Sequence, residues 1–274
     1  MVFASVLFLL MFGTVSFGQF EVEFNEIKGS LTKKDEFKKG FGRYDGIQIP
    51  LYKNEAVNFV VYSDKFSPRL MFLTPGGKPY KQSESDNGDV ASLISSVSES
   101  GDWLLFVVGD SSAQGNYTLQ YAIAGANSLE LPKGSDFCTT LDFIVAHANA
   151  YFLLFENPVE SKQAFVKLNG AEDAFIDESD GSYTAKMYEG NDLNEAQNKF
   201  DELSKKIDNC FGKDWSKTVQ SWTSTEDYKV KTVMYAEKFK SKQRYVLLGL
   251  KDLRSSKQKF IGDYVIEIVV NKRN

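Results

Sequence analysis

The sequence predicts a two-domain protein: an all-β sandwich, followed by an α+β layer in which an antiparallel sheet carries two helices on one face. Before residue 124, short apolar segments alternate with a period of two and are bounded by Gly, Asp or Ser. After residue 136, two stretches instead repeat apolar side chains every three or four positions. Residues 124–136 contain Pro132 and Gly134 and interrupt both patterns, so we expect a linker there.

Residues 1–18 contain no charged side chain and predict a cleaved signal peptide. The apolar run Val2–Phe12 is too short for a spanning helix, which needs about 20 apolar residues. Ser16 and Gly18 occupy the positions that a signal peptidase reads, and cleavage would release Gln19. An uncleaved anchor is the alternative. We therefore expect export to the periplasm, the cell surface or the medium, without a stable membrane span after cleavage.

The first domain, expected over 19–123, is predicted as an antiparallel β-sandwich because short strands follow one another with turn residues between them. Ile47, Ile49 and Leu51 alternate with other residues, and Val57, Phe59 and Val61 do the same further on. The strands are expected at 47–51, 57–61, 70–72, 90–97, 103–108 and 117–122.

The second domain, expected over 137–274, opens with a predicted amphipathic helix at 137–155 that ends before Pro158. A second helix is expected at 193–207, with Asp192 as its N-cap, Glu195 completing a capping box and Gly212 as its left-handed C-terminal residue. Strands are expected at 164–168, 183–188, 218–223, 228–239, 244–250 and 263–270.

The two cysteines, Cys138 and Cys210, fall in the first turn of the first predicted helix and the last turn of the second. These ends are neighbours if the helices pack antiparallel on one sheet face. In an exported protein such an even pair predicts a structural disulfide. Two buried thiols or a reactive cysteine are the alternatives.

Five segments between residues 27 and 122 combine turn residues and apolar strands in a characteristic order. They are Ile27-Lys28-Gly29-Ser30-Leu31, Tyr44-Asp45-Gly46-Ile47-Gln48-Ile49, Phe66–Phe72 with Pro75-Gly76-Gly77, Ser100–Val107 and Gly115-Asn116-Tyr117-Thr118-Leu119. Through these segments residues 27–122 resemble the bacterial pre-peptidase C-terminal domain, a small β-sandwich of secreted proteins. Ile47 stands where that family usually has an aromatic residue, and Ser67 replaces its usual Asp. The resemblance implies a module without catalytic residues that aids folding, export or binding; no peptidase domain is recognisable in this chain.

Composition and charge exclude several functions. The net charge of −5 argues against nucleic-acid binding, which needs a basic face. One His and two Cys cannot furnish a multi-ligand His/Cys zinc site. His147 lies along an apolar helix face, which favours packing over catalysis, and no Gly-x-Ser-x-Gly motif occurs. We assign no catalytic or cofactor-binding residue.

Calcium is the one cofactor that the sequence leaves open, through acidic loops at 84–89 and 177–181. Neither loop has EF-hand spacing, and both are typical of turns. The calcium candidates are Asp86, Asn87 and Asp89.

The leading hypothesis is an exported, non-catalytic binding or structural protein that engages a protein or a glycan through a sheet face or loops. Aromatic residues could form a binding platform, although packing in the core is the favoured interpretation. The alternative is a secreted hydrolase with a carboxylate-based site in the C-terminal domain. The aromatic candidates are Tyr62, Trp103, Trp215 and Trp222.

Overall fold

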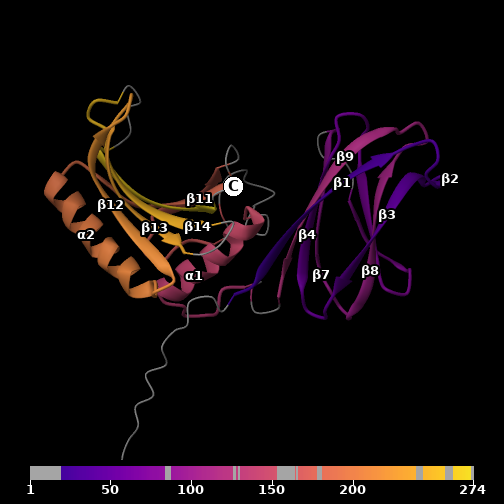
Figure 1. The fold of residues 1–274 in the computed structure, drawn as a ribbon, viewed down its shortest axis with the longest axis horizontal. Helices are drawn as coiled ribbons and strands as arrows, with labels where there is room; N and C mark the ends of the chain where they lie inside the picture. The colour runs from indigo at the N-terminus through magenta and orange to yellow at the C-terminus, as the bar shows by residue number, and fades with distance from the viewer. Residues whose placement is uncertain are drawn as a thin grey trace, which may run out of the picture.

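The computed structural model describes residues 20–83, 88–125, 128, 130–152, 164, 166–177, 181–238, 243–256 and 262–272 (Figure 1). The predicted signal peptide at 1–18 lies outside these residues. The fold class is confirmed: a β-sandwich is followed by an α+β layer built on an antiparallel sheet. Among the described residues, no helix combines the length and the apolar character that a membrane crossing requires.

The sandwich consists of a four-stranded sheet in the order β1-β9-β4-β7 and a five-stranded sheet in the order β2-β3-β8-β5-β6. Neighbouring strands run antiparallel throughout both sheets. All six predicted strands are present, whereas β1, β2 and β6 were not among the predicted strands. The strands are β1 Val22–Leu31, β2 Phe37–Lys38, β3 Gly42–Leu51, β4 Ala56–Tyr62, β5 Arg69–Leu73, β6 Pro79–Ser83, β7 Val90–Ser96, β8 Gly101–Gly109 and β9 Gly115–Ala124.

The α+β layer has a six-stranded antiparallel sheet in the order β10-β11-β15-β14-β13-β12. Both helices lie on the same side of this sheet (Figure 1). Inward side chains of β14 and β15, such as Leu248 and Ile268, share one buried cluster with Ile144 and Phe200 of the helices. The elements are α1 Phe137–His147, a 3-10 turn Ala148–Ala150, β10 Asp173–Asp177, β11 Ser182–Gly190, α2 Leu193–Cys210, β12 Trp215–Ser224, β13 Lys229–Glu237, β14 Arg244–Asp252 and β15 Tyr264–Lys272.

Helix α1 ends earlier than the predicted Phe155. It stops at His147, and the 3-10 turn after it leads to Tyr151 and Phe152, whose φ angles are 49° and 57°. A left-handed backbone cannot continue a right-handed helix. The turn buries Phe152 completely against Tyr183, at a ring separation of 5.8 Å. The apolar repeat in the sequence therefore outlasts the helix.

The N-cap of α2 is confirmed, but the rest of the predicted capping is wrong. Asp192 accepts hydrogen bonds from the backbone N–H groups of Asn194 and Glu195. The Glu195 carboxylate does not serve a capping box here, because it accepts from the Tyr188 hydroxyl at 3.2 Å. The C-cap is Phe211 in an extended conformation, and Gly212 has no positive φ.

No left-handed residue follows α2, because Phe211 is extended and a turn in which the Trp215 N–H donates to the Gly212 carbonyl at 3.2 Å leads into β12. Phe211 stacks on Trp215 there, with ring centroids 4.1 Å apart, and this contact fixes the exit direction.

The strand predicted at 164–168 is also wrong. Ala164 makes an isolated bridge by donating to the Ala174 carbonyl, and 166–168 are irregular. Leu168 is buried and donates its N–H to the Tyr183 hydroxyl, so its apolar character serves a loop. The sheet edge is instead β10, which the sequence analysis missed.

The two halves of the chain are packed together. Phe20 contacts Phe143 of α1 edge-to-face at 4.9 Å, and Val22 is buried in the same cluster. Lys272 Nζ lies 4.7 Å from the Phe24 ring centroid and 3.6 Å from that of Tyr151. The first strand of the sandwich thus contributes side chains to the core of the second half.

Candidate functional site

Within the described residues, no helix covers one face of the six-stranded sheet, which we call the open face. The strand register aligns Asp173, Lys186, Glu267, Gly249 and Thr232 in one row across five strands. Side chains alternate between the two faces of a sheet along each strand. The residues adjacent in sequence to this row face the buried cluster under the helices, so the row itself points away from the helices. The described part of the chain places no helix over this row (Figure 1).

The open face contains a pocket of about 380 Å³, lined at one end by residues before β13 and after β14. Its apolar lining comprises Phe175, Tyr228, Leu253 and Val265. Its charged lining comprises Asp173, Lys186, Glu189, Asp227, Lys251 and Glu267. Ligand sites commonly combine such an apolar lining with a few convergent polar groups.

A β-bulge assembles one wall of the pocket. Lys186 and Glu189 are three positions apart, so a regular strand would direct them to opposite faces. The register of β11 against β15 shifts between Lys186 and Tyr188, which inserts one extra residue and returns Glu189 to the open face. Lys186 Nζ then lies 2.8 Å from Glu189 Oε2.

This wall is held by further contacts. Glu189 also accepts the backbone N–H of Gly262 at 3.0 Å, and Glu172 lies 3.7 Å from Lys186 Nζ. The hydrogen bond to Glu189 raises the pKa of the Lys186 ammonium. The lysine therefore stays charged and remains a fixed part of the pocket.

The opposite wall is a second ion pair between neighbouring strands. Lys251 Nζ of β14 lies 2.5 Å from Glu267 Oε2 of β15. The same ammonium sits 5.4 Å from the ring centroid of Tyr228, within cation–π range. Lys251 consequently links the carboxylate to the aromatic side of the pocket.

These pairs bear on the hydrolase alternative. A glycosidase needs one carboxylic acid that stays protonated near neutral pH. Glu189 and Glu267 are each held in an ion pair with a lysine ammonium, at 2.8 and 2.5 Å. The two pocket walls therefore commit these carboxylates to contacts within the sheet.

Only one of the three calcium candidates, Asp89, belongs to the described residues. Asp86 and Asn87 lie outside them. Asp89 is exposed, and its backbone carbonyl accepts the N–H of Ser63 at 2.8 Å. The described residues contain no group of three or more His, Cys, Asp or Glu side chains that could hold a metal ion. The calcium site stays a prediction.

His147 is a packing residue in a tight environment. It is 1% exposed, and its ring lies 4.8 Å from that of Phe143. Burial lowers its pKa to about 4, so the ring is neutral at pH 7. Nε2 lies 2.9 Å from the Ser128 carbonyl oxygen, which places its proton there. His147 thus ties the segment after β9 to α1.

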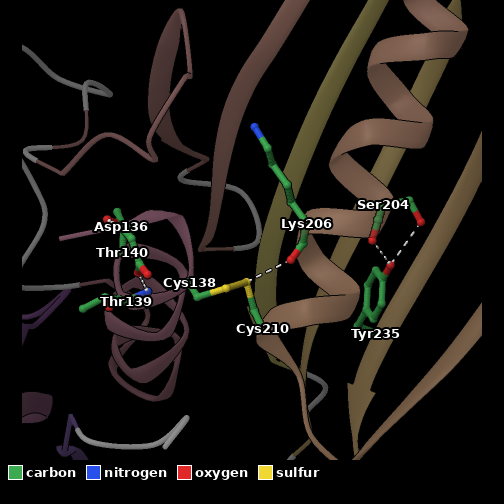
Figure 2. Close-up of a disulfide and its surroundings, with 8 residues drawn as sticks. All are labelled: Asp136, Cys138, Thr139, Thr140, Ser204, Lys206, Cys210 and Tyr235. Atoms are coloured by element: carbon green, nitrogen blue, oxygen red, sulfur yellow. Dashed lines mark hydrogen bonds between the residues drawn. A yellow bond between two sulfur atoms is a disulfide. The ribbon is translucent and has the colours of Figure 1, made fainter. Parts of the chain in front are cut away.

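The predicted disulfide is present. Cys138 and Cys210 are bonded, with their Cα atoms 5.0 Å apart. Figure 2 shows the bond joining the first turn of α1 to the last turn of α2. Asp136 caps α1 beside it by accepting the Thr139 N–H at 2.8 Å. The alternatives of buried thiols and a reactive cysteine are therefore set aside.

The aromatic candidates do not form one platform. Trp103 is fully buried in the sandwich and stacks on Phe72 at 4.7 Å, which confirms packing. Trp215 stacks at the end of α2, as described above. Tyr62 and Trp222 are 41% and 39% exposed, but they belong to different halves of the chain.

No model of a known protein family matches this sequence, and no curated protein matches it. Among solved structures, the pre-peptidase C-terminal domain of a Bacillus anthracis collagenase is similar, with 16% identity and a TM-score of 0.30 over 36% of this chain and 89% of that one.

Two further similarities cover comparable shares of the chain. PliG of Aeromonas hydrophila, a periplasmic inhibitor of g-type lysozyme, has 13% identity and a TM-score of 0.28 over 38% of this chain and 86% of its own. A structure of Bacillus endospore appendages, described as disulfide-linked pili, has 13% identity and a TM-score of 0.27 over 40% and 94%. At such low identities these similarities concern the fold alone.

Proposed function

We propose that this chain is an exported, non-catalytic binding protein that engages a protein or a glycan partner through the pocket on the open face. The observation that carries the proposal is the construction of the pocket. Two fixed ion pairs, Lys186–Glu189 and Lys251–Glu267, flank a lining that includes Phe175 and Tyr228. Such a site can orient a ligand through its fixed charges and its aromatic rings.

The dimensions of the pocket support the same function. Its volume of about 380 Å³ lies within the range of small-ligand sites, roughly 300–1,000 Å³. Val265 and Leu253 are buried and come from β15 and the segment after β14, so the floor is part of the folded sheet. A pocket on a rigid sheet needs little reorganisation on binding.

The disulfide supports the proposed location. Such bonds persist in oxidising compartments and are rare in the cytosol. Together with the signal peptide predicted at 1–18, the Cys138–Cys210 bond favours the periplasm, the cell surface or the medium.

Site-specific photo-crosslinking tests the proposal. A photoreactive amino acid at Thr232, in the row beside the pocket, should yield a discrete adduct in cells of the source organism. The same group at the exposed Lys205 of α2 serves as the matched control and should not. Absence of an adduct at Thr232, together with hydrolysis of a glycan or peptide substrate that Glu267→Gln abolishes, would establish the hydrolase instead.

A further inference from the structure

The pocket carries more negative than positive charge. Among the described residues, four carboxylates line it, from Asp173, Glu189, Asp227 and Glu267. Two ammonium groups from Lys186 and Lys251 also line it, so these described groups leave a formal charge of −2, four negative charges against two positive ones. An electrically matched ligand brings positive charge.

The two lysines cannot neutralise the surplus, because each is already paired. Lys186 is bound to Glu189 and Lys251 to Glu267, at 2.8 and 2.5 Å. Within the described part of the chain, Asp173 and Asp227 form no ion pair within 4.0 Å. Asp173 Oδ1 accepts only a hydrogen bond from the neighbouring Ala174 N–H among the contacts described. The surplus charge therefore belongs to these two aspartates, which line the cavity from β10 and from the segment before β13.

The remaining lining suits a long aliphatic side chain that ends in a cation. Val265 and Leu253 offer apolar surface for the stem. Tyr228 already has one ammonium near its ring face, and Phe175 provides another ring in the same pocket. A neutral glycan would use the rings but would leave the excess negative charge uncompensated.

We infer that the occupant of this pocket is a lysine or arginine side chain presented by a partner protein. The inference rests on the proposed binding function and specifies the chemistry of its ligand. The aspartates attract the cationic head, while the apolar lining contacts the stem. The pocket also has room for the residues on either side of this side chain in the partner. A free amine has no such flanking residues.

Titration of the mature, disulfide-bonded chain tests this inference. The probes are an acetylated and amidated pentapeptide, Gly-Gly-Arg-Gly-Gly, its lysine counterpart, and a version in which neutral citrulline replaces arginine. Backbone amide shifts of Lys251, Glu267 and Gly249 report occupancy of the open face. We expect the basic peptides to bind about fivefold or more tightly than the citrulline peptide.

Two variants locate the interaction. Asp173→Asn and Asp227→Asn each remove one negative charge from the pocket, and each should weaken the basic peptides by about fivefold or less. Asp102→Asn removes an exposed carboxylate from the sandwich and should leave the affinity unchanged. Unchanged melting temperatures show that the variants are folded. Equal binding of arginine and citrulline peptides, or full affinity in the double aspartate variant, would overturn the inference.

Other outcomes distinguish a failure of this inference from a failure of the proposed binding function. If chitobiose or maltose shifts the same amides and the basic peptides do not, the pocket binds a glycan: the proposed function holds and this inference falls. If spermidine binds but the peptides do not, the ligand is a free amine and the inference again falls. If no probe shifts the open face and Thr232 gives no photo-adduct, the proposed function itself fails.

Discussion

Replacing His147 by Gln should remove a large part of the acid sensitivity of the fold. His147, the last residue of α1, is buried against the segment after β9, where its neutral ring forms a hydrogen bond to the Ser128 carbonyl. Glutamine retains an N–H donor for that carbonyl but does not titrate. The comparison therefore isolates the protonation of this one side chain from its packing.

The pKa of His147 determines both the sign and the size of the effect. Burial lowers it from 6.5 to about 4. Above pH 6.5 neither the folded nor the unfolded chain protonates the ring, and the stability is complete. As the pH falls from 6.5 towards 4, the unfolded chain takes up the proton first, so the free energy of unfolding decreases. A difference of about 2.5 pKa units corresponds to roughly 3 kcal/mol.

Urea unfolding followed by tryptophan fluorescence, repeated at intervals from about pH 7 to pH 4, measures this loss. The carboxylates titrate in both proteins, so subtracting the His147→Gln curve from the wild-type curve cancels their contribution. We expect the wild type to lose roughly 3 kcal/mol relative to the variant across that interval. Parallel curves would refute the reasoning, because they would mean that the ring is protonated as readily in the folded chain as in the unfolded one.

Three further predictions concern the contacts that hold the second half together. Changing Cys138 and Cys210 to Ser should lower the free energy of unfolding by about 4 kcal/mol, because the bond closes a loop with a sequence separation of 72. Denaturant titration under non-reducing conditions measures this loss. Lys272→Met should cost about 2 kcal/mol by calorimetry, since the ammonium donates to the Asn149 carbonyl at 2.7 Å between two aromatic rings. Asp192→Ala should cost about 1 kcal/mol in the same assay through the lost N-cap of α2, and Asp192→Ser should restore most of it.

A specific result would contradict each of these three predictions. A cysteine double variant as stable as the oxidised wild type would mean that the bond does not constrain the unfolded chain. Lys205→Met is the matched control for Lys272→Met, because Lys205 is exposed on α2. Equal losses of stability in these two variants would mean that the contact of Lys272 between the halves does not stabilise the fold. An Asp192→Ser variant no better than Asp192→Ala would show that the side-chain oxygen is not what stabilises the helix.

The features that follow from local chemistry were predictable from the sequence. The strands of the sandwich alternate regularly, and the N-cap of α2 needs only Asp192 in front of an apolar repeat. The disulfide could be predicted because the helical period places Cys138 and Cys210 at helix ends, and the bond joins those two ends. The end of α1 was missed because the apolar side chains of Tyr151 and Phe152 are needed by the core even after the helix has stopped.

The pocket could not be predicted in the same way. Lys186 and Glu189 share a face only because a bulge inserts one residue, and nothing in the local sequence marks that insertion. Lys251 and Glu267 meet through the register of β14 against β15, which depends on pairing between separate segments. The sequence offered only a modest indication of this pair: Lys251 and Glu267 are charged residues on strands that are otherwise mostly apolar.

The order of the strands has a consequence for when the protein becomes able to bind. The disulfide encloses β10 and β11 between the bridged helices, while β12 to β15 all follow it in the chain. Strand β15 then inserts between β11 and β14, and it alone joins the two groups of strands. The wall formed by Lys186 and Glu189 belongs to β11, within the loop that the disulfide closes, whereas the wall formed by Lys251 and Glu267 belongs to β14 and β15, which are synthesised later. The two walls therefore come together only when β15 has joined the sheet. Occupancy of the pocket would therefore report that synthesis and assembly of the sheet are complete.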